Sequence, residues 1–468
     1  MGLTLFISSL AILIMLIVLT YYLRTARIDR ELESELNEEE DRPLLNIFSS
    51  QNLIFTAIIL TSLVLLFSIY LMVKGTLWEG HLMEWMNIVV RLMHITFGIA
   101  WIGASFYFVF LENALNRTRD VRDELAGNLW AIHGGGFYYI EKYKIAPAKI
   151  PKHLHWFKYE AYFTWLSGFS LLFIVYYFNA SSTLIDKNVL DINSITAVSI
   201  GIGSFVLAWI VYDLLCKSPL VRFPVLFGFT GLILASVFAY GYSQVFSAKA
   251  AFMHFGAMLG SIMAANVFMV IIPSQKAMVR AARKGTSPDA RLGKNAGRRS
   301  LHNNYFTLPV LFVMISNHFP VTFGHPKPWL ILMIITVGTA GVKHYLNVKE
   351  KGQLSVWVLP ASIILLLSAA FLTAPPKTAE ACTAAVSIEE VNAIIQDRCI
   401  SCHSTKTTDD FYTAAPNGIV YDTPADIIRM KDRILQRAVL TKTMPLNNKT
   451  NMTDAERDKI RCWIEQMK

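Results

Sequence analysis

The sequence predicts an all-α protein: a polytopic bundle of about ten membrane-spanning helices followed by a small soluble C-terminal domain. The composition indicates a membrane protein, because 54% of the 468 residues are hydrophobic and only 16% are charged. Apolar windows long enough to cross the hydrocarbon core, roughly 20 residues each, recur along the chain. After Pro375-Pro376 these windows stop and the composition becomes polar, which marks the start of a separate domain.

The apolar windows define the predicted spans and the domain boundaries. The spans are 4–22, 53–73, 85–111, 161–179, 194–215, 223–246, 251–273, 305–319, 329–347 and 355–373. We assign 1–78 to anchor helices with an acidic linker, 79–374 to an eight-helix domain, 375–386 to a linker and 387–468 to the C-terminal domain. The first span lacks a small-residue cleavage site, so we expect an anchor rather than a signal peptide.

The C-terminal domain contains the motif Cys399-Ile400-Ser401-Cys402-His403. A Cys-x-x-Cys-His motif predicts covalent haem c, with Cys399 and Cys402 bonded to the porphyrin and His403 as an axial iron ligand. Met444 is expected as the second axial ligand, with Met430 and Met452 as alternatives. A thioredoxin-like motif or half a zinc site is disfavoured, since neither a βαβ pattern nor a second cysteine pair accompanies the motif. We therefore predict a class I-like cytochrome c domain with one haem.

Haem c is attached outside the bacterial inner membrane, so the C-terminal domain is expected in the periplasm. The positive-inside rule tests this orientation independently. The loops predicted to lie inside carry 24 Lys and Arg residues, whereas those predicted outside carry 4. The net charge of +9 is therefore mainly a topology signal. It does not indicate nucleic-acid binding.

Three cysteines lie outside the haem motif. Cys382 and Cys462 both fall in the part of the chain expected in the oxidising periplasm. A disulfide between them would tie the linker to the last helix, and the alternative is two separate buried thiols. Cys216 is interpreted as a small apolar residue at a helix end.

The eight-helix domain looks like two copies of one four-helix unit. Met93-His94 and Met253-His254 occupy matching positions, and each helix is followed by a basic loop and a helix beginning Tyr-Phe-Thr. Polar residues within spans indicate function, and Arg91 with His94, His254 and His318 lies near the outer ends. We predict a b-type haem or another metal held by His94 and His254, with His318 as a replacement ligand. Packing or interface histidines are the alternative.

A second polar group lies on the side predicted to be cytoplasmic. His133-Gly134-Gly135-Gly136 predicts either backbone amides that contact an anionic planar ligand or a tight turn entering an interfacial helix. His302, Asn303 and Asn304 lie where a helix enters the membrane and are candidates for binding a polar substrate. Arg298 and Arg299 are interpreted as topology charges, and Asn266 and Glu160 as further buried polar candidates.

Several separated motifs resemble those of the bacterial membrane-bound urate oxidases fused to cytochrome c. The stretches are Arg91–His94, Gly98–Tyr107, His133–Tyr138, Tyr159–Gly168 and His302–Tyr305, together with the C-terminal haem motif. The resemblance extends from about residue 80 to the end. The first two predicted helices depart from the eight-helix pattern of that family, so we expect them to serve anchoring or assembly.

The resemblance implies oxidation of urate to 5-hydroxyisourate in purine catabolism. Electrons would pass through haem c to a respiratory-chain acceptor, either a terminal oxidase or a soluble cytochrome. We expect urate on the cytoplasmic side, oriented by the amides of Gly134–Gly136 and by His302, Asn303 and Asn304, with His133 or His302 accepting a proton. Electrons would then cross a core of roughly 30 Å. A cofactor between His94 and His254 would relay them, unless urate binds near the outer face.

Two other classes of function stay open. A quinol-linked electron-transfer protein would use the outer histidines to meet a quinol and would reduce its own cytochrome c. A non-catalytic haem-binding or sensory module would titrate without turnover. Reduction of haem c by urate would distinguish the urate oxidase interpretation from both of these alternatives.

Overall fold

The computed structural model describes residues 50–467, except for 119, 148, 152–153, 350–354, 375–381, 383–384, 410–411 and 413. The chain divides into two compact units, residues 1–85 and 86–468, which we describe separately. The first unit includes α2 (Ser50–Val73) and the beginning of α3 (Leu77–Ala114). The predicted span 4–22 lies outside the described residues.

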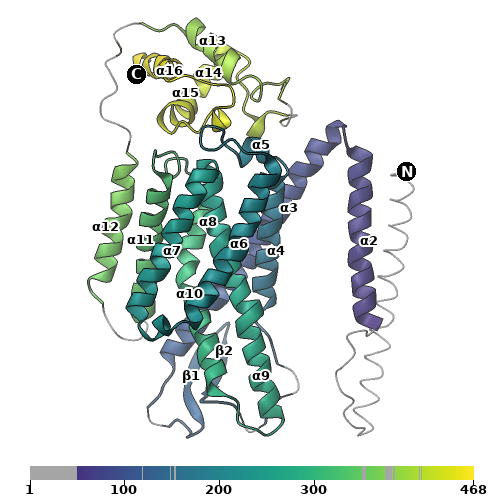
Figure 1. The fold of residues 1–468 in the computed structure, drawn as a ribbon, viewed down its shortest axis with the longest axis vertical. Helices are drawn as coiled ribbons and strands as arrows, with labels where there is room; N and C mark the ends of the chain where they lie inside the picture. The colour runs from purple at the N-terminus through teal and green to yellow at the C-terminus, as the bar shows by residue number, and fades with distance from the viewer. Residues whose placement is uncertain are drawn as a thin grey trace. The chain divides into compact units, whose positions relative to one another are not determined.

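The second unit contains a helix bundle and the C-terminal domain (Figure 1). After α3, the bundle helices are α4 (Tyr159–Leu172), α5 (Ala180–Thr183), α6 (Ser194–Lys217), α7 (Pro224–Val245), α8 (Ala248–Ala265), α9 (Ile272–Arg283), α10 (Ala290–Ser316), α11 (Pro328–Lys349) and α12 (Val358–Leu372). Within the described residues, five helices are long and apolar enough to cross a membrane. The other nine predicted spans each overlap a helix, and the bundle is consistent with a membrane protein.

Two prolines shape the helices that carry polar residues. Pro273 lacks an amide hydrogen and lies at the start of α9, directly after the π-helical turn Asn266–Ile271 that continues α8. A wider turn before a proline avoids the clash of its ring with the preceding carbonyl groups. Pro309 lies inside α10, where it removes one helical hydrogen bond.

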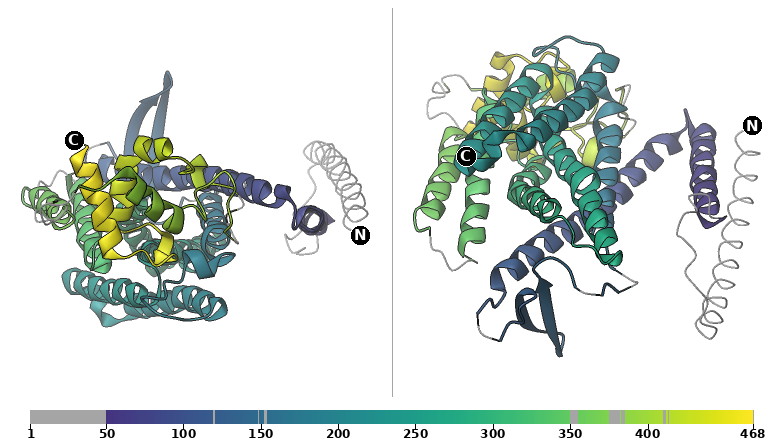
Figure 2. Two further views of the ribbon diagram at one scale, coloured as in Figure 1. Left: turned by 90° about the horizontal axis from the view of Figure 1, so that it is seen from above. Right: turned by 60° about the horizontal axis from the view of Figure 1, so that its bottom comes forward.

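The loop between α3 and α4 forms a β-hairpin, so the all-α prediction is wrong for this segment. Strands β1 (Leu125–His133) and β2 (Gly136–Tyr143) pair antiparallel, and the hairpin projects from the bundle (Figure 2). Gly134 and Gly135 both have positive φ angles, 58° and 81°, which suit a two-residue hairpin turn. The tight turn was expected, but it joins two strands rich in aromatic and branched residues and does not enter a helix.

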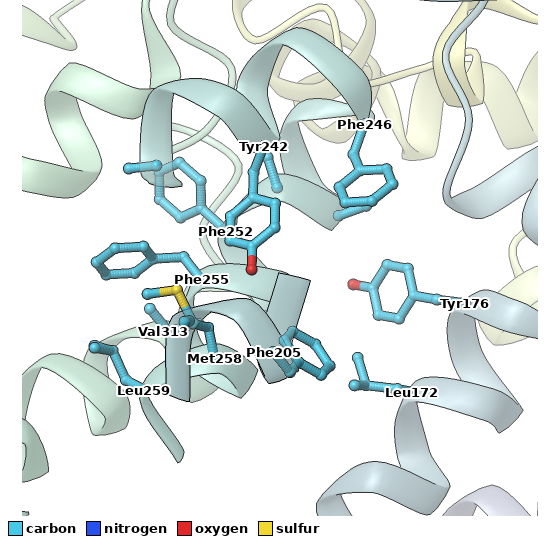
Figure 3. Close-up of a cluster of buried hydrophobic side chains, with 14 of the residues drawn as sticks. Leu172, Tyr176, Phe205, Tyr242, Phe246, Phe252, Phe255, Met258, Leu259 and Val313 are labelled. Atoms are coloured by element: carbon cyan, nitrogen blue, oxygen red, sulfur yellow. The ribbon is translucent and has the colours of Figure 1, made fainter. Parts of the chain in front are cut away.

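The hydrophobic core of the bundle lies between α4, α6, α7, α8 and α10 (Figure 3). Phe246, Phe252 and Phe255 are fully buried there, beside Tyr242 and Met258. The helices α8 and α10 approach closely at Gly256, where an added Cβ would lie 2.4 Å from a methyl carbon of Val313. Small residues at such crossings are typical of membrane bundles, because association there depends on close packing.

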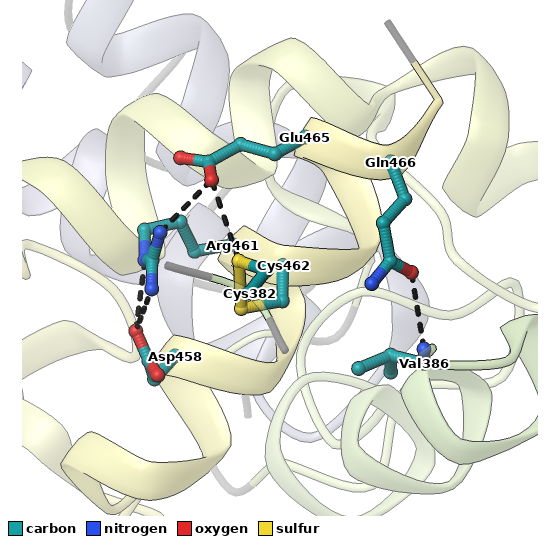
Figure 4. The surroundings of a disulfide bond; sticks show 7 residues. All are labelled: Cys382, Val386, Asp458, Arg461, Cys462, Glu465 and Gln466. Carbon is teal, nitrogen blue, oxygen red and sulfur yellow. Dashed lines mark hydrogen bonds and ion pairs between the residues drawn. A yellow bond between two sulfur atoms is a disulfide. The ribbon is translucent and has the colours of Figure 1, made fainter. Parts of the chain in front are cut away.

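The C-terminal domain has its own core, built around α13 (Ile388–Arg398), α14 (Pro424–Arg429) and α16 (Asp454–Gln466). Capping boxes at Thr423 and Thr453 fix the starts of α14 and α16. Of the two alternatives left open for Cys382 and Cys462, the structure has the disulfide, with a Cα–Cα distance of 5.4 Å (Figure 4).

Candidate functional site

A cavity of about 280 Å³ lies between α3, α4, α8 and α10. Its wall is mostly apolar and includes the aromatic rings of Trp101, Trp165, Phe169 and Tyr176. Polar side chains also line it: Arg91, His94, Thr164, Ser261, Asn317 and His318. A concave, mainly apolar space with a few convergent polar groups is the usual form of a small-molecule site.

His94 is held in one orientation at the wall of this cavity. Its Nδ1 lies 3.0 Å from the carbonyl oxygen of Thr164 and 3.2 Å from Oγ of Ser167. Because a carbonyl oxygen only accepts hydrogen bonds, Nδ1 carries the proton and Nε2 has a free lone pair. Gly168 leaves room for the ring, since a Cβ there would lie 2.7 Å from Cε1 of His94. The described residues provide no hydrogen bond to Nε2.

Arg91 lies one helical turn before His94 on α3. Its Nε donates to Oδ1 of Asn87 at 2.7 Å, and no partner of the terminal nitrogens is found among the described residues. His318 follows the end of α10 and lines the same cavity. Arg91, His94 and His318, which the sequence analysis expected near the outer ends of their helices, therefore line the same cavity.

His254 lies elsewhere, in a closed aromatic environment. It is fully buried, its Nδ1 donates to the carbonyl of Ala250 at 2.9 Å, and its Nε2 lies 3.0 Å from the hydroxyl of Tyr177. The tyrosine donates to Nε2, so both ring nitrogens are engaged. It does not line the cavity that His94 lines. This arrangement does not fit a haem held between His94 and His254, and no electron-transfer step is assigned to that pair.

His302 and Asn303 belong to a buried hydrogen-bond network in the half of the bundle nearer to the hairpin. The hydroxyl of Tyr212 lies 2.8 Å from Nδ1 of His302 and accepts from Nδ2 of Asn266 at 3.1 Å. The same Nδ2 donates to Oδ1 of Asn303 at 2.8 Å. Asn303 in turn donates to the carbonyl of Met263 at 2.9 Å. The amide groups of Asn303 are thus occupied by protein partners.

Arg299 completes this network, and its interpretation as a topology charge is wrong. The residue is 1% exposed, donates to Oδ1 of Asp213 at 2.5 Å and to Oδ1 of Asn266 at 3.2 Å, and stacks over the ring of Tyr212. A buried guanidinium requires a paired carboxylate, since an unpaired charge is costly in a membrane. Asp213, an acidic residue in an apolar span, was the sequence signal that could have revealed the pair.

The remaining residues of the His302–Tyr305 motif face other helices. Asn304 donates to Oγ of Ser105 at 3.2 Å and accepts from Asn347 at 2.9 Å. Tyr305 lies 2.7 Å from Nδ1 of His344. The motif therefore connects α10 to several neighbours and does not converge on one ligand.

His133 occupies the last position of β1, beside the hairpin turn, and is exposed. The hydrogen bonds that join His302 and Asn303 to their neighbours do not include it. The structure therefore does not bring His133 into the same network as His302 and Asn303. Glu160 is half-buried, and its Oε2 has no hydrogen-bond partner among the described residues.

In the C-terminal domain, Cys399, Cys402 and His403 follow directly after α13. The Nδ1 of His403 lies 3.0 Å from the carbonyl oxygen of Ile419, so this nitrogen donates and Nε2 has a lone pair. Burial lowers the pKa of His403, which favours the neutral imidazole that binds iron. Both cysteines are outside the disulfide. These residues fit a covalently attached haem, which Cys399 and Cys402 would bond and His403 would bind through Nε2.

The three candidate methionines differ in their surroundings. Met452 is buried in the core of the C-terminal domain, and Met430 packs against that core. Met444 is half-buried and stands outside this hydrophobic cluster. Its backbone is fixed by hydrogen bonds to the carbonyl of Arg437 and from the guanidinium of Arg457. In the described residues, no group of three or more His, Cys, Asp or Glu side chains could hold a metal ion.

Comparison with known proteins gives one match. The family model described as urate oxidase N-terminal matches residues 80–374, which is more than half of the chain and coincides with the eight-helix region expected from the sequence. No curated protein and no solved structure matches the chain. The cavity, the His302 network and the β-hairpin all lie within the matched region, and the chain belongs to the urate oxidase N-terminal family.

Proposed function

We propose that this protein oxidises urate to 5-hydroxyisourate and passes the electrons to haem c in its C-terminal domain, from which a respiratory-chain acceptor takes them. One observation carries the proposal: a region that belongs to the urate oxidase N-terminal family is continuous with a Cys-x-x-Cys-His motif. The covalent haem supplies a one-electron acceptor when bound. Cys399, Cys402 and His403 would hold it, and Met444 would supply a further iron ligand.

In this proposal the electrons of the reaction go to an acceptor other than oxygen, which takes them in a soluble oxygen-dependent enzyme. Urate and one water molecule yield 5-hydroxyisourate, two electrons and two protons. A haem held by Cys399, Cys402 and His403 would supply one-electron acceptance, and a respiratory-chain acceptor would take up the two electrons in turn. The helices supply binding and orientation for the purine, while the haem carries the electrons.

Contacts between the C-terminal domain and the bundle support a direct route. Nδ2 of Asn447 donates to the carbonyl oxygens of Ser182 and Ile185, at 2.9 and 2.7 Å. At Gly324, an added Cβ would lie 2.7 Å from the carbonyl oxygen of Thr441. Met444 lies between these two contact points in the chain. The segment that would supply the second iron ligand is therefore also the segment that meets the bundle.

The test is anaerobic addition of urate to the purified full-length protein, followed by the absorption bands of haem c. We expect urate to reduce the haem and 5-hydroxyisourate to form in proportion, one molecule for every two electrons. A pyridine-haemochrome assay on the same sample establishes the haem type. A haem that stays oxidised with urate but is reduced by a quinol would refute the proposal in favour of a quinol-linked protein.

A further inference from the structure

We propose that the cavity between α3, α4, α8 and α10 is the binding site for the planar purine anion. This inference rests on the proposed function and assigns its substrate site. It replaces the expected location beside His133, His302 and Asn303 with one formed by Arg91, His94 and His318.

The cavity has the size and the walls that a flat bicyclic ligand requires. Its volume of about 280 Å³ lies near the lower end of the roughly 300–1,000 Å³ that small-molecule sites span. Gly98, Gly168 and Gly256 line it, so backbone rather than side chains forms part of the wall. The rings of Trp165 and Phe169 stack on each other with centroids 5.0 Å apart, at 15° between their planes, and both line the cavity. Such aromatic faces suit stacking against a purine.

The polar groups of the cavity complement urate chemically. Urate presents carbonyl oxygens that accept hydrogen bonds, ring N–H groups that donate them, and a delocalised negative charge. The terminal nitrogens of Arg91 donate and are cationic, which suits the anion and its carbonyl oxygens. Nε2 of His94 accepts, because Nδ1 donates to Thr164, and this suits a purine N–H. Of the two, His94 is half-buried in the mostly apolar wall, whereas Arg91 is exposed at the cavity.

Most polar groups of the network around His302 are already hydrogen-bonded to one another. Asn303 has both its donor and its acceptor engaged, Asn266 bridges Tyr212 and Asn303, and Nδ1 of His302 meets the tyrosine hydroxyl. A ligand would have to displace hydrogen bonds that already satisfy each other. We infer that these residues hold α6, α8 and α10 together at the inner side of the cavity, whose wall includes Met263, the partner of Asn303.

The location also shortens the path for electrons. Arg91, His94 and His318 lie toward the end of the bundle that contacts the C-terminal domain, since His318 precedes the loop in which Gly324 meets Thr441. A purine in this cavity would not require electrons to cross the entire hydrocarbon core of roughly 30 Å. No second haem is then needed between substrate and haem c.

The experiment compares cavity variants with matched controls in the full-length haem-loaded protein. Arg91→Gln removes the cation, and Gly168→Ala displaces the ring of His94. Arg222→Gln and Gly203→Ala are the controls, because Arg222 is exposed outside the cavity and a Cβ at Gly203 meets nothing within 4 Å. Haem c content and gel-filtration elution establish folding, and Arg91→Lys, which keeps the charge, is the second variant if Arg91→Gln fails to fold.

We expect Arg91→Gln and Gly168→Ala to raise the KM for urate-dependent haem reduction roughly ten- to a hundred-fold, the usual effect of losing one charge-assisted hydrogen bond in the first variant and of leaving one purine group unpaired in the second. Both controls should keep the wild-type KM. If all four variants keep the wild-type KM, the cavity is not the urate site, although the proposed function stands. A b-type haem that is present in the wild type and absent from His94→Gln would likewise overturn the inference.

Failure of the proposed function is measured separately. If wild-type haem is not reduced by urate, binding is measured directly by titration calorimetry with urate as the probe. Urate binding that Arg91→Gln weakens and Arg222→Gln preserves would support the cavity as a purine site without oxidation. Absence of binding to the wild type would overturn both proposals.

Discussion

Removal of the disulfide between Cys382 and Cys462 should destabilise the C-terminal domain without changing the bundle. The bridge joins positions 80 residues apart and closes a loop that contains the haem motif, Met444 and nearly the whole domain core. Such a cross-link stabilises mainly by restricting the unfolded chain. The double variant Cys382→Ser/Cys462→Ser removes it without leaving a reactive thiol.

The magnitude follows from the length of the loop. With the cysteines 80 positions apart, the chain-entropy relation gives about 4.5 kcal/mol at 25 °C, near the upper end of the usual range. For a denaturant slope of about 2 kcal/mol per molar urea, the unfolding midpoint of the domain should fall by on the order of 2 M. The loss is large beside the roughly 5–15 kcal/mol that stabilises a typical domain.

The assay is urea unfolding of the full-length protein in detergent, followed through the absorption and circular dichroism of haem c. The control is the thermal stability of the bundle, which should be equal in the two proteins. Wild-type protein treated with a mild reductant should approach the double variant. A free-energy loss below about 1 kcal/mol would show that closure of this loop does not stabilise the domain and would refute the argument.

Further predictions concern the two domains and their contact. Asn447→Ala removes both hydrogen bonds from this side chain to the bundle, which should weaken the contact between the domains by about 1–3 kcal/mol. In stopped-flow experiments, reduction of haem c by urate should be slower in this variant, whereas reduction by dithionite should be unchanged. Gly256→Ala should lower the thermal midpoint, because overpacking against Val313 costs about 1–3 kcal/mol, whereas Gly203→Ala should not. Met444→Ala should lower the haem reduction potential in a redox titration, since thioether ligation raises it; an unchanged potential would exclude Met444 as a ligand. Burial alone would raise the pKa of Glu456, but hydrogen bonds from Arg398 and Thr453 lower this pKa below its ordinary value of 4.5. The ionised Glu456 therefore stabilises the folded C-terminal domain fully above that pH, and this stabilisation is lost as the pH falls through the folded-state pKa. Urea midpoints of the C-terminal domain between pH 6 and pH 3 should show this decline, and Arg398→Gln should weaken it.

Much of the architecture could be predicted because it depends on local pattern. Apolar windows gave the helix positions, since a helix in lipid must be hydrophobic along its length. The pairing of Cys382 with Cys462 was one of two open alternatives, and the tertiary structure decided it. The hairpin at Gly134 and Gly135 was missed, because a short amphipathic segment outside the membrane fits either a helix or a strand.

The polar residues that the sequence singled out do not all lie together in the structure. Duplicated Met-His pairs suggested that His94 and His254 act together, yet His254 is enclosed by aromatic rings and hydrogen-bonded at both nitrogens. Arg299 was interpreted as a surface charge, yet it is buried against Asp213. Helical position gives the depth of a side chain in the bundle, but not the neighbour toward which it points.

The sequence alone therefore determined the positions of the apolar helices, the position of the Cys-x-x-Cys-His motif, and which polar side chains lie within those helices. Those properties follow from composition and from spacing along one chain segment. The tertiary structure decided which of these side chains lie together. Arg91, His94 and His318 line the cavity, whereas His302 and Asn303 are hydrogen-bonded to other side chains of the bundle. The physical reason is that convergence depends on how each helix is rotated about its axis and where it crosses the next. Contacts between residues distant in sequence, such as the approach of α8 and α10 at Gly256 and Val313, fix both.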